Sequence, residues 1–125
     1  MQELWKDIKD YEGLYEISNK GAVWCKKKGH CRRIGLGNPS ISSYKFVTLE
    51  KDGVRKQFPI HRLVATAFLD KKDFRYHKTD DLNNINPDSL IVNHKDENKH
   101  NNCVDNLEWC TNAYNTVYSN KRLRR

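Results

Sequence analysis

Short runs of alternating apolar and polar residues fill the first half of the chain and predict strands. Aromatic and β-branched residues gather at positions 4–8, 15–17 and 22–25, and turn sequences at 11–13 and 19–21 separate them. We therefore expect a small antiparallel meander. Residues 44–50 and 54–59 flank Lys51-Asp52-Gly53, where Asp-Gly is a strong hairpin signal. A second hairpin should follow the meander.

The middle of the chain changes to helical periodicity. Apolar residues recur at i, i+3, i+4, i+7 and i+8, which is the stripe of an amphipathic helix: Ile60, Leu63, Val64, Ala67 and Phe68. His61 and Arg62 would lie near the start of this helix, and we favour a structural or DNA-contact role for His61 over catalysis. Residues 70–89 lack clear periodicity, so we interpret them as a surface insertion.

The sequence of the last third of the chain predicts a strand, a loop, a second strand and a helix. Residues 90–92 and 107–110 form the two short strands, and Thr111 or Asn112 is a good N-cap for a helix from about 112 to 120. His94 then ends the first strand, Asn106 starts the second, and Asn115 lies about one turn into the helix. We expect these three side chains to converge on one pocket, with the amphipathic helix packed under the unit.

These residue types suit phosphodiester hydrolysis. A histidine can take a proton from water at neutral pH, and an asparagine carbonyl can hold its imidazole in the basic tautomer, so we assign these roles to His94 and Asn106. The amide oxygens of Asn93 and Asn115 would suit a hard divalent cation, Mg²⁺ or Mn²⁺, with phosphate oxygens and water completing its shell. Asn98, Asn101 and Asn102 are interpreted as turn residues.

The segment VNHKDENKHNNCVDNLEWCTNAYN, residues 92–115, resembles the HNH endonucleases, which have a ββα-metal fold and a single-metal site. The resemblance implies that His94 is the general base, that Asn106 orients it and that Asn115 is a metal ligand. Many members of that family have an aspartate before the base, where this chain has Asn93. Two neutral amides attract a cation less than a carboxylate does, so we expect weak metal binding without DNA.

The N-terminal segment WKDIKDYEGLYEISNKGAV, residues 5–23, closely resembles a nuclease-associated modular domain that often precedes HNH domains in phage and intron-encoded proteins. The string HRLVATAF, residues 61–68, recurs before the HNH motif in the related subfamily. The resemblance implies that the N-terminal module binds DNA. Most of its matching residues are expected to be scaffold, since Gly13 and Gly21 permit turns and Trp5 fills a small core.

The charge of the chain agrees with a nucleic-acid partner. There are 23 Lys plus Arg against 16 Asp plus Glu, a net charge of +7, and a basic protein favours a polyanion. The candidate contacts to the backbone of double-stranded DNA are Lys26, Lys27, Lys28, Arg32, Arg33, Lys45, Arg55, Lys56 and Arg62. A solvated basic surface is the alternative interpretation of these residues.

The four cysteines are expected to be free thiols. Cys25 with Cys31, and Cys103 with Cys110, have separations of six and seven positions, which argues against the tight knuckle of a zinc site. The chain contains no run of 18 apolar residues and no signal peptide, so we expect it in the cytoplasm of a bacterial host cell, encoded by a phage or mobile element. Its oligomeric state stays open, and a monomer would favour nicking.

The sequence therefore predicts an α+β fold with a small N-terminal antiparallel β module, an amphipathic helix and a ββα-metal unit. We divide it into a DNA-binding module at 1–57, an HNH nuclease domain at 58–120 and a basic tail at 121–125. The predicted function is metal-dependent cleavage or nicking of double-stranded DNA by a homing-type endonuclease. The main alternative is a catalytically silent DNA-binding descendant of such a nuclease, favoured by Asn93. A third class, an RNA- or protein-binding regulator, has no specific feature in its favour.

Overall fold

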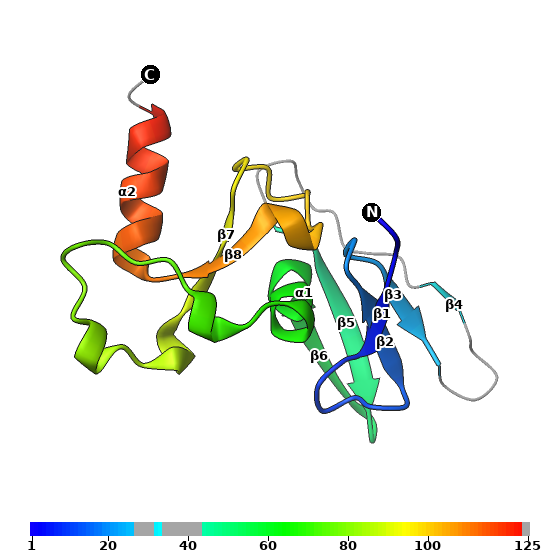
Figure 1. Cartoon of the computed structure of the whole chain (residues 1–125). Helices are drawn as coiled ribbons and strands as arrows, with labels where there is room; N and C mark the ends of the chain where they lie inside the picture. Colours follow the sequence, from blue (N-terminus) through cyan, green and yellow to red (C-terminus); the bar gives the residue numbers. More distant parts are fainter. Residues whose placement is uncertain (27–31, 34–43, 124–125) are drawn as a thin grey trace.

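The N-terminal module is a four-stranded antiparallel sheet in the order β1-β2-β3-β4 (Figure 1). Its strands are β1 (Trp5–Asp7), β2 (Tyr15–Ser18), β3 (Val23–Cys25) and β4 (Arg32–Arg33). The computed structural model describes residues 1–26, 32–33 and 44–123. The predicted meander is confirmed. The backbone of Arg32–Arg33, which we expected in a basic loop, adds a short fourth strand beside β3.

The predicted hairpin is also present. Strands β5 (Phe46–Lys51) and β6 (Val54–Pro59) pair from Phe46 opposite Pro59 to Lys51 opposite Val54. The two turn residues have positive φ, 53° at Asp52 and 78° at Gly53, as a tight hairpin turn requires. Asp and Gly adopt this backbone more readily than most residues do. The local sequence thus determines both the turn and the register.

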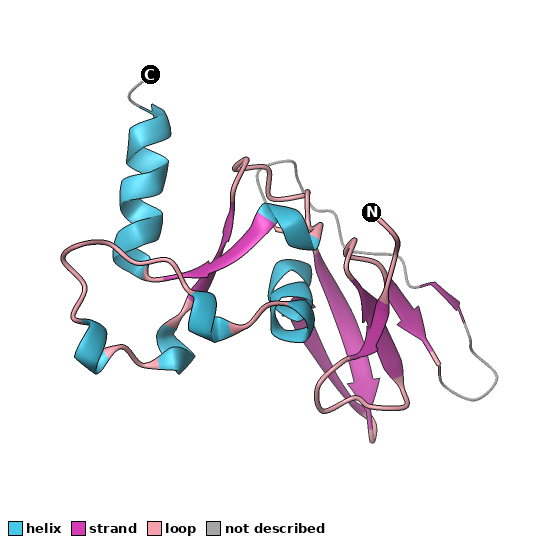
Figure 2. Cartoon of the chain, viewed as in Figure 1, coloured by secondary structure: helices cyan, strands magenta, loops and turns pink. Residues whose placement is uncertain are grey.

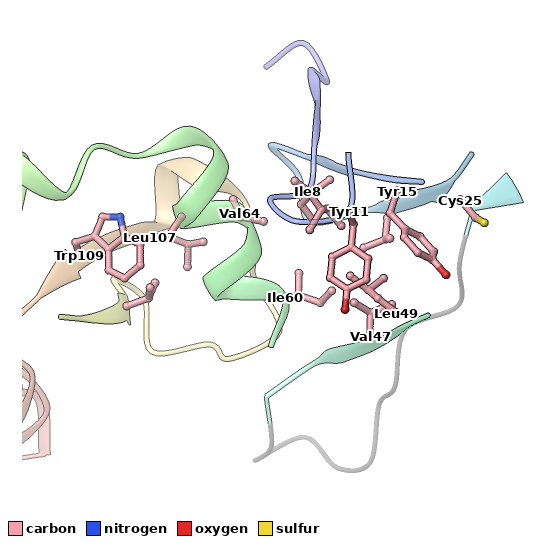
Figure 3. Close-up of a cluster of buried hydrophobic side chains, with 14 of the residues drawn as sticks. Ile8, Tyr11, Tyr15, Cys25, Val47, Leu49, Ile60, Val64, Leu107 and Trp109 are labelled. Atoms are coloured by element: carbon pink, nitrogen blue, oxygen red, sulfur yellow. The ribbon is translucent and has the colours of Figure 1, made fainter. Parts of the chain in front are cut away.

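Helix α1 (Ile60–Phe68) follows β6 directly and lies at the centre of the molecule. Ile60, Val64 and Ala65 are buried, and Leu63 and Phe68 are partly buried against the same core, so the predicted amphipathic stripe is confirmed. One core extends on both sides of this helix (Figure 3). Residues of the N-terminal module, including Tyr11 and Tyr15, lie on one side, and Leu107 and Trp109 lie on the other.

The insertion between α1 and the C-terminal unit contains only short 3₁₀ turns (Figure 2): η1 (Lys71–Asp73), η2 (Leu82–Asn84) and η3 (Pro87–Ser89). Most of its residues are exposed or half-buried, as predicted. It is nevertheless tied to the unit that follows. Arg75 forms a parallel bridge with Cys110, and its backbone N–H donates to the Trp109 carbonyl over 2.8 Å.

The C-terminal unit has the predicted strand, loop, strand and helix. Strand β7 (Ile91–His94) pairs antiparallel with β8 (Leu107–Cys110), and η4 (Val104–Asn106) precedes β8. Helix α2 (Asn112–Leu123) follows, and the Thr111 hydroxyl caps it by accepting from the backbone N–H of Tyr114 over 3.2 Å. Of the two N-cap candidates, Thr111 and Asn112, the structure therefore has Thr111 as the N-cap.

In the described part of the chain, neither helix is long and apolar enough to cross a membrane. Cys25, Cys103 and Cys110 are free thiols, as expected, and Cys31 lies outside the described residues. Burial raises the pKa of the Cys110 thiol to about 12, so this cysteine behaves as a small apolar core residue. The division at residue 57 stays a prediction.

Candidate active site

A small hollow brings three of the four predicted site residues together at the end of the β7–β8 hairpin. Its volume is about 200 Å³, and it is lined by Tyr44, Val92, Asn93, His94, Glu97, Lys99, Asn115 and Ser119. His94 and Asn93 come from β7, and Asn115 comes from α2. A larger hollow of about 390 Å³ lies against α1, but its lining includes no histidine. The chemistry therefore points to the smaller one.

His94 is buried and held by one side chain. It is only 4% exposed, and its Nε2 donates to Oδ1 of Asn102 over 2.8 Å. Because an amide oxygen can only accept, this bond fixes the proton on Nε2 and leaves Nδ1 as the basic nitrogen. Burial lowers the pKa of His94 below its usual 6.5, although Asn102 and nearby Asp96 act in the opposite direction. The imidazole is therefore neutral at pH 7 and can accept a proton.

Asn102 thus occupies the position that we expected for Asn106. We interpreted Asn102 as a turn residue, yet it is only 5% exposed and its amide oxygen contacts the histidine. Asn106 makes no hydrogen bond to His94 among the described contacts. Its Oδ1 accepts from the backbone N–H of Asp96, and its Nδ2 donates to Asp96 Oδ1 and to the Asn101 carbonyl.

The difference has a physical reason. Asn106 ends the 3₁₀ turn before β8, so its side chain faces the loop that leaves β7 and satisfies that loop's polar groups. Asn106 therefore holds the loop in shape, and the loop carries Asn102. Sequence spacing placed both asparagines near His94 but could not say which amide faces the imidazole.

A carboxylate lies directly behind Asn93. The two residues are register partners across the hairpin, and Nδ2 of Asn93 donates to Oε2 of Glu108 over 2.8 Å. The Glu108 side chain is only 11% exposed, and Arg75 lies 3.7 Å from its other oxygen. This bond commits the Asn93 nitrogen and leaves its carbonyl oxygen available as a ligand. It also polarises the amide, which strengthens that oxygen as a donor to a hard cation.

These donors fit a hard divalent cation. Amide and carboxylate oxygens are what Mg²⁺ and Mn²⁺ prefer, and Asn93, Asn115 and Glu97 all line the hollow. The described residues contain no group of three His, Cys, Asp or Glu side chains that could hold a metal ion. Such a cation would therefore depend on amide oxygens, with substrate phosphate and water completing its shell.

Two aromatic rings cover the other side of His94. Tyr44 stacks on it with ring centroids 5.8 Å apart, and His61 lies 5.1 Å away. Nδ1 of His61 is buried without a hydrogen-bond partner, and burial lowers the pKa of this histidine to about 3. His61 thus stays neutral and packs, which agrees with the structural one of the two roles, structural or DNA-contact, that we favoured over catalysis. Tyr44 had no motif to mark it, because it lies fifty positions before the histidine that it covers.

Comparison with known proteins identifies the relatives of this arrangement. A family model described as the NUMOD4 motif matches residues 3–50. DNA endonuclease I-HmuI of Bacillus phage SP01 is 37% identical over 111 residues, which cover 89% of this chain and 54% of that protein. The uncharacterized HNH endonuclease L245 of Acanthamoeba polyphaga mimivirus is 34% identical over 120 residues, covering 95% of this chain and 30% of the relative.

A solved structure agrees with the sequence matches. The structure described as DNA binding and cleavage by the HNH homing endonuclease I-HmuI superimposes with a TM-score of 0.72 at 36% identity, covering 95% of this chain and 59% of that one. The chain is a homologue of the HNH endonucleases. It spans about half the length of I-HmuI, and the resemblances expected for its N-terminal and C-terminal parts are both confirmed.

The residues predicted to contact DNA in this HNH homologue differ in their exposure and in their ion pairs. Lys56 and Arg55 are exposed on β6, and Arg55 lies 3.5 Å from Glu50. Lys26 is instead paired with Asp7 at 2.7 Å and lies 3.9 Å from Glu16, so its charge is largely balanced. Arg62 and Lys45 are half-buried, and Arg62 lies over the ring of Trp109.

The other predicted contacts lie wholly or partly outside the described residues. Lys27 and Lys28 lie outside the described residues, as do the side chains of Arg32 and Arg33 and most of the basic tail. Their role in DNA binding by this HNH homologue stays a prediction.

Proposed function

We propose that this chain is a metal-dependent HNH endonuclease that hydrolyses phosphodiester bonds of double-stranded DNA, by nicking or cleaving, as phage or mobile-element homing enzymes do. The observation that carries the proposal is the neutral, buried His94, whose Nε2 is fixed by Asn102. Its other nitrogen is then the basic one, in a residue that lines a hollow with two amide donors. The relatives named as DNA endonucleases support the same activity.

His94 acts as the general base in this proposal. Its Nδ1 accepts a proton from a water molecule, and the resulting nucleophile attacks the phosphorus of a backbone phosphate. Asn102 accepts the hydrogen bond from Nε2 and so stabilises the imidazolium that forms. The low pKa of His94 keeps the base unprotonated before the attack, since burial disfavours its charged form.

Asn93 and Asn115 would hold a Mg²⁺ or Mn²⁺ ion, with Glu97 near enough in the same hollow to contribute. Such an ion supplies charge stabilisation for the phosphate and the departing 3′ oxygen. Glu108 compensates in part for the missing aspartate by accepting from Asn93. The exposed lysines and arginines of the β5–β6 hairpin and the N-terminal module would hold the DNA backbone without reading its sequence.

The proposed activity is tested by cleavage of supercoiled plasmid with Mg²⁺, with Mn²⁺ and with EDTA. We expect relaxed or linear product that appears only with the metal ion, and relaxed circles from a monomer with one site. We place this activity in the cytoplasm of a bacterial host cell. Absence of cleavage under every metal condition would contradict the proposal.

The catalytically silent alternative is favoured by one observation, the amide of Asn93 in place of a carboxylate. It predicts intact plasmid together with a clear shift of DNA in a gel. In that case Asn93→Asp should restore cleavage if charge at this position is what the site lacks.

A further inference from the structure

The side chain that orients His94 lies in a segment without regular structure. Asn102 sits between β7 and η4, where no ladder of backbone hydrogen bonds fixes it. Its position therefore depends on the hydrogen bonds of Asn106 within the loop and on packing from outside the hairpin. Among the described residues, that packing includes the turn between β2 and β3 of the N-terminal module, which lies beside this segment in the fold (Figure 1).

Two contacts join the turn to the segment. The backbone N–H of Val104 donates to the Asn19 carbonyl over 2.8 Å. Gly21 packs so closely that a Cβ built on it would lie 3.0 Å from Cβ of Asn102 and 3.4 Å from its carbonyl oxygen. A separation of 3.0 Å is tighter than nine in ten real Cβ contacts, so any larger residue at position 21 would push Asn102 by a few tenths of an ångström.

The turn itself is held firmly. Ser18 is fully buried, and its hydroxyl accepts from the backbone N–H groups of Lys20 and Ala22 while donating to Glu3. Oδ1 of Asn19 accepts from the Leu4 backbone, and Nδ2 of Asn19 donates to the Gln2 carbonyl. Buried polar groups with every partner satisfied make a rigid element. A rigid turn can therefore restrict where the segment that packs against it lies.

We propose that the turn Ser18–Ala22 is a positioning element of the active site: it fixes Asn102, and through Asn102 it sets the tautomer and orientation of His94. The N-terminal module would then contribute to the rate of the reaction as well as to binding. This inference rests on the proposed function for its effect on cleavage. Its effect on the His94 imidazole is independent of that function.

Gly21→Ala tests the proposal against Gly13→Ala as a matched control. Both glycines have positive φ, +87° and +79°, so both variants carry similar backbone strain. A Cβ on Gly13 meets nothing within 4 Å, whereas one on Gly21 meets Asn102 most closely and Ile60 at 3.4 Å. We expect Gly21→Ala to slow single-turnover cleavage by at least about tenfold, with the DNA dissociation constant changed by less than about twofold. Gly13→Ala should leave both quantities at the wild-type values.

Val104→Pro is a second variant in case Gly21→Ala does not fold. Residue 104 begins the 3₁₀ turn and Cys103 before it is extended, so a proline is compatible with the backbone at this position. It removes the N–H that donates to Asn19 and places the ring Cδ against the Asn19 carbonyl, so the contact between the turn and the segment is lost. We expect a slower single-turnover rate and an unchanged affinity for DNA. A wild-type cleavage rate in Val104→Pro would show that the hydrogen bond from Val104 to Asn19 does not help to position Asn102.

The imidazole of His94 provides a readout that needs no cleavage. Nitrogen chemical shifts of the free protein at neutral pH should report the Nε2-protonated tautomer in the wild type and in Gly13→Ala. In Gly21→Ala and Val104→Pro they should move towards a mixture of tautomers, as in Asn102→Ala. Wild-type shifts in Gly21→Ala would overturn the proposal, even if the protein cleaves DNA. Altered shifts in a protein that never cleaves would support the positioning element and contradict the nuclease.

Discussion

At the scale of single residues, the site separates the side chain that reacts from the side chains that place it. His94 carries the basic nitrogen, Asn102 fixes its tautomer, and Asn106 shapes the loop between them through three hydrogen bonds. The sequence placed His94, Asn93 and Asn115 together, because their order and spacing follow from a hairpin and a helix. It could not place Asn102, since the direction of a side chain in an irregular loop depends on contacts that are distant in sequence.

Asn106→Ala should therefore act through the loop. Removing three partly buried hydrogen bonds should lower the free energy of unfolding by about 1–3 kcal/mol and slow turnover less than loss of His94 does. Chemical denaturation and single-turnover cleavage measure the two effects. Asn98→Ala is the control, because Asn98 is exposed and its Oδ1 accepts from the His100 backbone in the same loop. Wild-type stability and turnover in Asn106→Ala would exclude this role.

Glu108→Gln tests whether the carboxylate behind Asn93 supports metal binding. Glutamine can still accept from Asn93 but has no charge, so the Asn93 oxygen should become a weaker ligand. The Mg²⁺ concentration for half-maximal cleavage should rise by on the order of tenfold, while DNA affinity measured without metal stays the same. An unchanged Mg²⁺ requirement would show that Asn93 needs no charge behind it.

At the scale of elements, the insertion at 70–89 is more than the surface loop that its composition predicts. Asp80 accepts from the Thr111 hydroxyl over 2.6 Å and from the His77 backbone over 2.8 Å, and Thr111 in turn caps α2. The insertion thus fixes the start of the helix that carries Asn115. Turn signals and exposed composition could not show this link, because it joins residues thirty-one positions apart.

The hydrogen bond from Thr111 holds the pKa of Asp80 below its usual value. A lowered pKa in the folded state adds stability above the unfolded value of about 3.9, and that stability disappears as the pH falls through the lowered pKa. Asp80→Asn should therefore be less stable than the wild type at pH 6, and the difference should be smaller at pH 3, which lies below the unfolded value. Urea unfolding at both pH values measures this, with exposed Asp88→Asn as the control. An equal difference at both pH values would contradict the account.

At the scale of the whole molecule, one hydrophobic core joins the N-terminal module to the ββα unit through α1. Local sequence patterns predicted both helices and every strand except β4, because these elements follow from local spacing. It could not predict that the modules share a core, since that depends on which faces meet. The N-terminal module, expected mainly to bind DNA, also borders the segment that carries Asn102.

The surface charges should contribute unequally to DNA binding. Lys56 is exposed, whereas Lys26 is already paired with Asp7 and close to Glu16. Lys56→Ala should weaken DNA binding. The slope of the logarithm of affinity against the logarithm of salt concentration should become less steep by about one, because one phosphate contact is lost. Lys26→Ala should change both much less. Titrations at several salt concentrations measure this, and equal losses in the two variants would show that the ion pair opens on DNA.

The most direct test of the central claim is His94→Ala, with single-turnover cleavage and DNA affinity measured on the same duplex. If His94 is the general base, cleavage should be abolished while the dissociation constant stays within about twofold of the wild type, because the residue lies in the hollow and not on the basic surface. Residual cleavage near the wild-type rate, or a loss of binding as large as the loss of cleavage, would contradict the account.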